Sequence, residues 1–318
     1  MYYLGIDLGG TNIAIGVVDE NNQIVIKDSV PTKAQRPPEE IVIDMAKLCR
    51  DLLERANIPL SEVAYAGIAA PGSIDPEKGV VIYANNLPFR DFPIADLLRK
   101  HLPIEKVYLD NDANAAAYGE AIAGAARGCR YAVMITLGTG LGGGIVIDGK
   151  IYSGFNYAGG ELGHIVIEYD GVPCTCGRKG CWESYSSATG LIRMTKEKMA
   201  ETKETLMWEL AEGSLDNVSG KTAFAAMKQG DKAATEVVDK YISYLACGVT
   251  NIINIFQPEV LCIGGGICRE GDYLVKPLLE KVSAEQYTRS LKKQTEIKIA
   301  ELGNDAGIIG AAALGKQQ

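Results

Sequence analysis

Short stretches of alternating apolar and small residues open the chain. Residues 2–26, YYLGIDLGGTNIAIGVVDENNQIVI, predict two strands joined at the glycines, then a turn at Glu20–Asn22 and a third strand. Further strands are predicted from the apolar runs VAYAGIAAPG, VYLDND and EVLCIGGGI, which begin at Val63, Val107 and Glu259. The beginning of the chain is therefore expected to be rich in β-structure.

Apolar residues at helical spacing predict the rest of the regular structure. Helices are expected over Pro38–Asn57, Ile94–His101, Thr189–Gly230, Lys232–Phe256 and Pro277–Tyr287. A last helix of small residues is expected near the C-terminus, with Asn304 or Asp305 as its N-cap. Because strands and helices alternate, the predicted fold class is α/β.

The glycine-rich hairpin of the first strands has a second copy. DLGGTNIAIGVVDE aligns with TLGTGLGGGIVIDG, so that Leu8, Gly9, Val17 and Asp19 fall on Leu137, Gly138, Val146 and Asp148. The ordered match favours two duplicated α/β halves, each opening with such a hairpin. Chance similarity between two glycine-rich hairpins is the alternative.

Composition and charge narrow the class of protein. The 318 residues are 47% hydrophobic, which is enough for one large or two moderate domains. A net charge of −8, with Lys and Arg never clustered beyond pairs, argues against nucleic acid as a partner. Residues 1–10 lack the basic start of a secretory signal, and the uncharged run 131–147 contains five glycines, so neither export nor a membrane span is expected. We expect a cytoplasmic protein.

Three glycine-rich turns follow predicted strands. They are DLGGT at Asp7–Thr11, LGTGLGGG at Leu137–Gly144 and GGGI at Gly264–Ile267. Glycine lets the backbone turn tightly and offer its N–H groups to phosphate oxygens. One such turn is weak evidence, but three indicate a nucleotide-phosphate site, at which Asp7 would orient Mg²⁺ through water.

A second candidate site lies where a strand meets an alanine-rich helix. VYLDNDANAAAYGEA places Asp110, Asn111 and Asp112 at this corner. An Asp here can accept a proton from a substrate hydroxyl while Asn111 holds the neighbouring hydroxyl. Asp112 could instead serve only as the N-cap of the helix, although capping and catalysis are compatible.

One histidine and three cysteines have the spacing of metal ligands. His164, Cys174, Cys176 and Cys181 form the pattern H-x9-C-x-C-x4-C, which predicts a closed, tetrahedral, structural zinc site. Free thiols beside an unrelated histidine are the alternative. Four protein ligands leave no position for a reacting water, so the zinc is expected to fix the surrounding loop.

That loop carries side chains suited to a neutral, polyhydroxylated ligand. The second ring nitrogen of His164 can donate to a hydroxyl, and Glu161 and Glu183 can accept from hydroxyls. Rigid polar groups are needed to discriminate between such ligands. For Glu183 the alternative is a charge at a helix N-terminus.

Six motifs together resemble one family. They are DLGGTN (7–12), DNDANAAA (110–117), GTGLGGG (138–144), GELGH (160–164), CTCGRKGCWE (174–183) and GGGI (264–267). With them the chain resembles, over nearly its whole length, the ROK family of bacterial sugar kinases and related repressors, most closely the glucokinase branch. The resemblance implies an actin-like ATPase (ribonuclease H-like) fold with two α/β domains around a cleft. The implied bounds are 1–115 plus 304–318 for a small domain and 116–303 for a large domain carrying the zinc loop.

The resemblance also implies roles for individual residues. Asp112 is expected to be the catalytic base. Sugar contacts are expected at Gly72, Asn86, Asn111, Asp112, Glu161, His164 and Glu183. ATP and Mg²⁺ are expected at Asp7, Gly9, Gly10, Thr11, Asn12, Gly138, Thr139, Gly140, Gly265 and Gly266. The structural Zn²⁺ is expected at His164, Cys174, Cys176 and Cys181.

The implied activity is ATP-dependent phosphorylation of glucose at its 6-hydroxyl. Kinases of N-acetylmannosamine, N-acetylglucosamine or fructose are alternatives, and CWESYSSATGL together with GELGH favours glucose. A sugar-sensing repressor is a distant alternative, because such repressors carry a DNA-binding domain before the first strand, which here is expected at Tyr2. A homodimer or homotetramer is implied.

One segment departs from the family pattern. Where members commonly have Asn-Leu-x-Trp, this chain has Asn86-Leu87-Pro88-Phe89, which retains an aromatic ring but lacks the indole N–H. Asn85 is adjacent to Asn86 and competes with it for the role of sugar contact. Both points bear on which sugar is bound.

Overall fold

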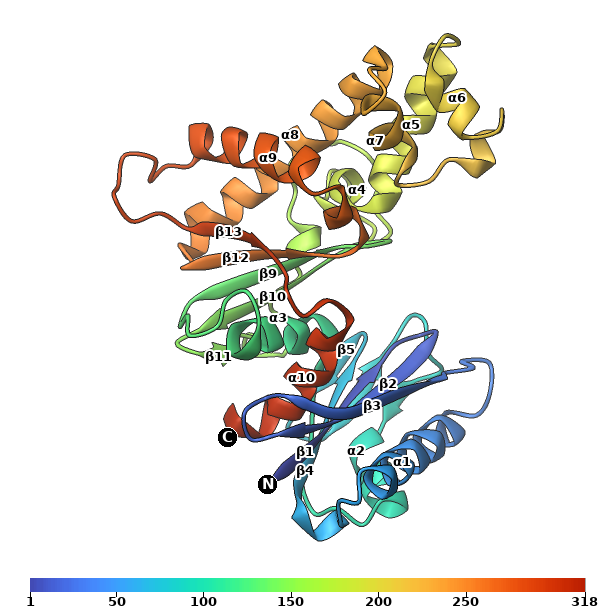
Figure 1. The fold of residues 1–318 in the computed structure, drawn as a ribbon, viewed down its shortest axis with the longest axis vertical. Helices are drawn as coiled ribbons and strands as arrows, with labels where there is room; N and C mark the ends of the chain where they lie inside the picture. Colours follow the sequence, from blue (N-terminus) through green and yellow to red (C-terminus); the bar gives the residue numbers. More distant parts are fainter. Residues whose placement is uncertain (318) are drawn as a thin grey trace. The chain divides into compact units, whose positions relative to one another are not determined.

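The computed structural model describes residues 1–317 (Figure 1). Contacts within the chain group it into two compact units. Unit 1 contains residues 1–134, 144–160 and residue 300 onward, and unit 2 contains 135–143 and 161–299. Each unit is described by itself below.

The main sheet of unit 1 confirms the strands predicted at the start of the chain. Its order is β3-β2-β1-β4-β8. Strands β1, β2 and β3 pair antiparallel, whereas β1, β4 and β8 run parallel. The bounds are β1 (Tyr2–Leu8), β2 (Asn12–Asp19), β3 (Ile24–Pro31), β4 (Val63–Ala70) and β8 (Val107–Asn111).

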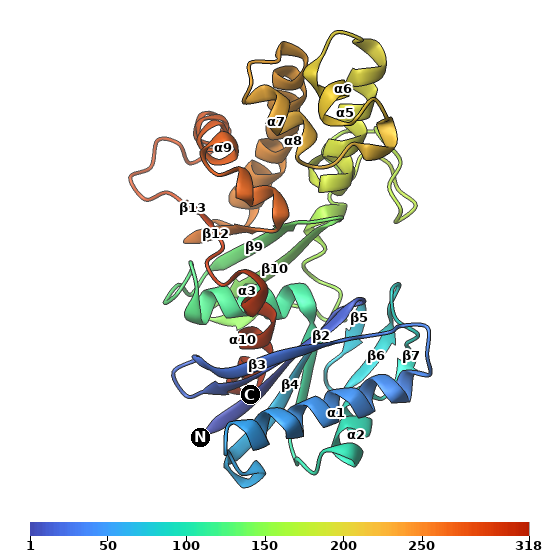
Figure 2. The ribbon, with the colours of Figure 1, turned by 45° about the vertical axis from the view of Figure 1, so that its right-hand side comes forward.

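Successive side chains of β1 point to opposite faces of this sheet, and each face is covered by a different helix. Leu4, Ile6 and Leu8 are fully buried in the core that also contains the apolar side of α1 (Pro38–Arg55). The other face meets α10 (Ala306–Ala313), as Figure 2 shows. Helix α2 (Ile94–His101) packs against α1 and matches its predicted bounds.

Glycine lets α10 approach the sheet closely. A Cβ atom on Gly67 of β4 would lie 1.8 Å from the carbonyl oxygen of Ala311. Since Asp7 shares its face of β1 with Gly5, it too points at this helix, and its Oδ2 would lie 2.4 Å from a Cβ atom on Gly307. Close packing of α10 thus places the carboxylate of Asp7 beside the first turn of that helix.

Helix α3 (Asp112–Ala123) packs against α10 within unit 1. The expected domain boundary between residues 115 and 116 lies within α3, but the two units do not divide there. The reason is the extensive contact between two helices rich in alanine and glycine, which holds all of α3 in unit 1.

Unit 1 also contains a small antiparallel sheet in the order β5-β6-β7. Its strands are β5 (Ser73–Asp75), β6 (Val80–Tyr83) and β7 (Arg90–Phe92), and a 3-10 turn at Leu60–Glu62 precedes β4. Phe89 is only 1% exposed and stacks on Phe92 with ring centroids 4.6 Å apart. The ring of Phe89 therefore belongs to the core of unit 1, and its bearing on sugar choice stays a prediction.

A second five-stranded sheet repeats the strand order of the first. Its order is β11-β10-β9-β12-β13, in which the third, second, first, fourth and fifth strands follow one another as they do in the first sheet. This agreement supports the predicted duplication. The bounds are β9 (Ala132–Leu137), β10 (Leu141–Ile147), β11 (Lys150–Ile151), β12 (Val260–Gly264) and β13 (Glu296–Ile299).

The helices of unit 2 correct two predictions. The segment 189–230 is not continuous, because Gly213 has a positive φ of 74° and the side chains of Thr205 and Ser214 cap new turns. Its parts are α5 (Ala188–Glu201), α6 (Leu206–Leu210), a 3-10 turn (Leu215–Asn217) and α7 (Thr222–Met227), preceded by α4 (Glu183–Ser186). Helix α8 (Lys232–Phe256) matches its predicted bounds.

The second correction concerns α9 (Asp272–Glu285), which begins before Pro277 rather than at it. Leu274, Leu278 and Val282 are buried at four-residue spacing, so packing outweighs the one helical hydrogen bond that proline removes.

Asp305 is the N-cap residue of α10, yet its side chain makes no capping hydrogen bond. Its carboxylate instead pairs with Lys27 at 2.5 Å, and a 3-10 turn at Gly303–Asp305 leads directly into the helix. Within residues 1–317, no helix is long and apolar enough to cross a membrane.

Candidate functional site

The corner between β8 and α3 is held by Asn111. Its Oδ1 accepts hydrogen bonds from the backbone N–H groups of Ala113 (2.9 Å) and Asn114 (3.3 Å), which makes it the N-cap of α3. Its Nδ2 donates to the carbonyl of Gly72 at 3.2 Å. Asn111, not Asp112, is therefore the N-cap, and one Nδ2 hydrogen remains for a ligand.

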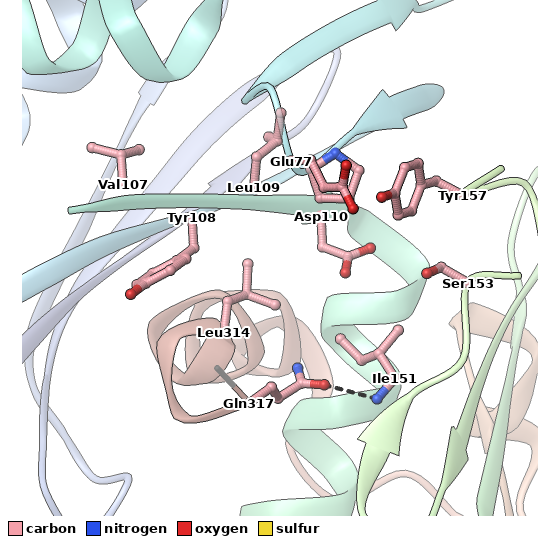
Figure 3. A pocket seen from close by; sticks show the side chains of 11 residues that line it. Glu77, Val107, Tyr108, Leu109, Asp110, Ile151, Ser153, Tyr157, Leu314 and Gln317 are labelled. Atoms are coloured by element: carbon pink, nitrogen blue, oxygen red, sulfur yellow. Dashed lines mark hydrogen bonds between the residues drawn. The ribbon is translucent and has the colours of Figure 1, made fainter. Parts of the chain in front are cut away.

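The two aspartates of this corner have different surroundings. Burial raises the pKa of Asp112, which lies in the first turn of α3. Asp110 accepts through Oδ1 from the N–H of Asn111 (2.7 Å) and from Nδ2 of Asn114 (3.0 Å). Asp110 and Tyr157 line a cavity of about 440 Å³, whose lining does not include Asp112 (Figure 3).

Asp7 lies at the end of β1, where its carboxylate makes no hydrogen bond or ion pair within residues 1–317. Burial, and then the nearby charge of Asp112, raises its pKa from 3.8 to about 6. With Gly9 and Asn12 it lines a cavity of about 460 Å³. A buried carboxylate without a cationic partner beside a second carboxylate fits a hydrated divalent cation.

The raised pKa of Asp7 predicts a pH-dependent change in stability. The folded protein binds this proton more tightly than the unfolded chain, so stability falls as pH rises from about 4 to about 6. Asp7→Asn should therefore raise the free energy of unfolding at pH 7.5 by up to about 3 kcal/mol, the equivalent of a pKa change from 3.8 to about 6. Urea denaturation of both proteins at pH 4.5 and pH 7.5 checks this, and an equal gain at both pH values would contradict it.

The first glycine-rich turn joins β1 to β2. Gly9 N–H donates to the carbonyl of Asn12 at 3.0 Å, while Thr11 and Asn12 are exposed. Asn86 lies against this turn, since a Cβ atom on Gly10 would come 3.1 Å from Asn86 Cβ. The structure thus brings the predicted contact Asn86 to the predicted phosphate turn within unit 1.

The second turn joins β9 to β10, and Gly138 N–H donates to the carbonyl of Gly140 at 3.0 Å. Glu183 at the start of α4 accepts from the N–H of Leu141 through Oε2 at 2.9 Å. Its other oxygen, Oε1, lies 3.9 Å from Cys174 Sγ. Glu183 therefore joins the second turn to the loop that carries Cys174, Cys176 and Cys181, called the cysteine loop below. Neither of the two roles predicted for Glu183 included this connection.

A cavity of about 450 Å³ in unit 2 is lined by both the second turn and the cysteine loop. The lining includes Thr139, Gly140, Cys174, Glu183 and Thr189.

Glu161, one of the predicted sugar contacts, is exposed and directly precedes the 3-10 turn Leu162–His164.

The third turn requires glycine at its second position. Gly265 has a φ of 96°, and a Cβ atom there would lie 2.4 Å from the carbonyl oxygen of Leu137, at the end of β9. Gly266 has open space around it and begins the 3-10 turn Gly266–Glu270. The second and third turns therefore lie together in unit 2.

The predicted metal ligands converge. One ligand atom from each of His164, Cys174, Cys176 and Cys181 lies within 4.8 Å of the others. Cys174 Sγ is 3.7 Å from His164 Nδ1, and Cys176 Sγ is 3.6 Å from Cys181 Sγ. Zn–S bonds of about 2.3 Å in a tetrahedron place ligand atoms about 3.8 Å apart, so the set fits zinc.

The surroundings of the thiols shift the pKa values of Cys176 and Cys181 in opposite directions. The backbone N–H of Arg178 lowers the pKa of Cys176, whereas burial raises that of Cys181 to about 12. A bound cation would offset the raised pKa of Cys181 and favour its thiolate. Because Nδ1 of His164 faces the cluster, Nε2 is the nitrogen free to donate to a ligand.

Three comparisons give this geometry a family context. The glucokinase of Thermotoga maritima is 39% identical over 316 residues, covering 99% of this chain and 97% of that protein. The N-acetyl-D-glucosamine kinase of Haemophilus influenzae is 30% identical and covers 99% of both chains. A crystal structure of a ROK family glucokinase from Streptomyces griseus in complex with glucose and AMPPNP covers 100% of both chains with a TM-score of 0.80 and 34% identity.

The structural likeness confirms the expected α/β, actin-like ATPase fold. The family model for ROK proteins matches residues 3–318, nearly the entire sequence. By this match and by its full-length relatives, the chain belongs to the ROK family.

Proposed function

We propose that the protein is an ATP-dependent glucokinase, which transfers the γ-phosphoryl group of ATP to the 6-hydroxyl of glucose. The observation that carries this proposal is the half-buried carboxylate of Asp112 near that of Asp7, in a chain 39% identical to a glucokinase over its full length. The related glucokinase from Streptomyces griseus was crystallised in complex with glucose and AMPPNP, which supports both substrates.

Asp112 is the proposed general base. The 6-hydroxyl oxygen forms a bond to the γ-phosphorus, its proton passes to Asp112, and the bond from phosphorus to the β,γ-bridging oxygen breaks to release ADP. Burial raises the pKa of Asp112, and a raised pKa makes its carboxylate a stronger base. The remaining Nδ2 hydrogen of Asn111 would hold a neighbouring hydroxyl.

The other proposed sugar contacts are Gly72, Asn86, Glu161, His164 and Glu183. His164 would donate from Nε2, and the glutamates would accept from sugar hydroxyls. Zinc held by His164 and the three cysteines would fix these side chains without entering the reaction.

The nucleotide would be held by backbone N–H groups. The proposed phosphate contacts are Gly9, Gly10, Thr11 and Asn12 in the first turn and Gly138, Thr139 and Gly140 in the second. Gly265 and Gly266 would contact the adenosine. Mg²⁺, when bound, would neutralise phosphate charge, and Asp7 would hold it through water.

An N-acetylhexosamine kinase is the second candidate, since the relative from Haemophilus influenzae is named as one. ADP release with ATP and Mg²⁺ should be measured for glucose, mannose, fructose, N-acetylglucosamine and N-acetylmannosamine. We expect glucose to give the highest kcat/KM. A higher value for an acetamido sugar would contradict the glucose assignment, and no turnover with any of the five would contradict the kinase.

The other expectations from the sequence and from the resemblance also stay predictions. They are a homodimer or homotetramer, a cytoplasmic location, and the absence of nucleic acid and membrane partners. Sedimentation of the purified protein tests the first.

A further inference from the structure

Thr32, the residue after β3, holds the first glycine-rich turn from outside it. Its side chain is fully buried. Its hydroxyl donates to the carbonyl of Gly9 at 2.7 Å, and its N–H donates to the carbonyl of Thr11 at 2.8 Å. Two carbonyl groups of the turn are thus tied to one residue more than 20 positions away in the sequence.

This contact sets the direction of the amides in the turn. The C=O of Gly9 and the N–H of Gly10 belong to one planar trans peptide, so they point in opposite directions. Holding the Gly9 oxygen at Thr32 therefore turns the Gly10 N–H away from Thr32. The N–H groups of Gly10 and Thr11 donate to no backbone carbonyl of residues 1–317, which leaves them available to an anion.

The second glycine-rich turn is held in the same manner. The hydroxyl of Thr189 donates to the carbonyl of Thr139 at 2.7 Å, and the N–H of Ala188 donates to the carbonyl of Gly138 at 2.8 Å. Each turn therefore receives one hydroxyl and one backbone N–H from a distant segment. Thr189 is exposed, whereas Thr32 is enclosed and can act only through its turn.

We propose that Thr32 and Thr189 are positioning residues that hold the two turns with their N–H groups directed at the phosphates of the nucleotide. This inference rests on the proposed function. Removing a threonine hydroxyl leaves a turn carbonyl without its donor and lets the peptide rotate, so the loss should fall on nucleotide affinity.

The test is binding of AMPPNP with Mg²⁺, measured by calorimetry, together with steady-state kinetics. Thr32→Val keeps the shape of the side chain but removes the hydroxyl. It should raise the Kd for AMPPNP and the KM for ATP about tenfold, while kcat and the KM for glucose stay within about twofold. Thr32→Ser restores the hydroxyl and should restore the affinity.

Thr195→Val is the matched control. Thr195 is also fully buried, and its hydroxyl donates to the carbonyl of Leu191 at 2.7 Å, but in the middle of α5. It should leave AMPPNP binding unchanged. The inference is overturned if Thr32→Val binds AMPPNP like the unchanged protein, or loses affinity for AMPPNP and glucose equally.

Two results keep this test separate from the proposed function. If the unchanged protein binds AMPPNP but phosphorylates no sugar, the kinase assignment fails while the calorimetric test of Thr32 still stands. Should Thr32→Val not fold, the exposed Thr189→Val carries the same test on the second turn, and unchanged AMPPNP affinity there overturns the inference.

Discussion

Asp112→Asn should lower kcat about 10²- to 10⁴-fold while the KM for glucose changes little. The amide keeps the size and hydrogen-bonding reach of the side chain but cannot take the proton of the 6-hydroxyl. Because burial raises the pKa of Asp112, the unchanged enzyme should lose kcat/KM on acidification at a higher pH than an exposed aspartate would give. Steady-state kinetics across pH measure both effects.

Asp110→Asn is the control from the same corner. Burial raises the pKa of Asp110 as well, but Asp110 lines the cavity of Figure 3, and Asp112 does not. The Asp110→Asn variant should therefore keep most of the turnover of the unchanged enzyme. Equal losses in the two variants would assign the effect to the structure of the corner, and near-normal turnover of Asp112→Asn would remove Asp112 from the role of base.

Cys176→Ala should release the metal. The same change should raise the KM for glucose by about 10- to 100-fold. With one of four ligands gone, the cysteine loop is no longer tied at Cys176, and His164 loses the ion that fixes its ring. Glu183 lies against the same loop. Zinc content by elemental analysis and glucose kinetics on the same preparation check the two effects.

Cys247→Ala provides the comparison, because Cys247 is a half-buried thiol outside the cluster. It should keep both metal and glucose affinity. A metal-free Cys176→Ala protein with unchanged KM for glucose would separate the zinc loop from the sugar site.

Features that depend on neighbours in sequence were predictable from the sequence. The four metal ligands lie within 18 residues of one another, so their spacing alone predicted the cluster that the structure brings together. The same holds for the glycine-rich turns, since each is a short connection after a strand. The repeated hairpin predicted two duplicated α/β halves, and the matching strand orders of the two five-stranded sheets support that prediction.

Features that depend on distant contacts were decided only by the tertiary structure. Whether Asn111 or Asp112 caps α3 depends on backbone geometry at the corner, and the burial of Phe89 depends on its stack with Phe92. The contact of Asp7 with Gly307 joins residues 300 positions apart, and no local pattern marks Thr32 or Thr189 as partners of the turns. Local chemistry thus determined which groups this protein carries, whereas packing of α10, β3 and α5 decided which of them meet and what surrounds each carboxylate.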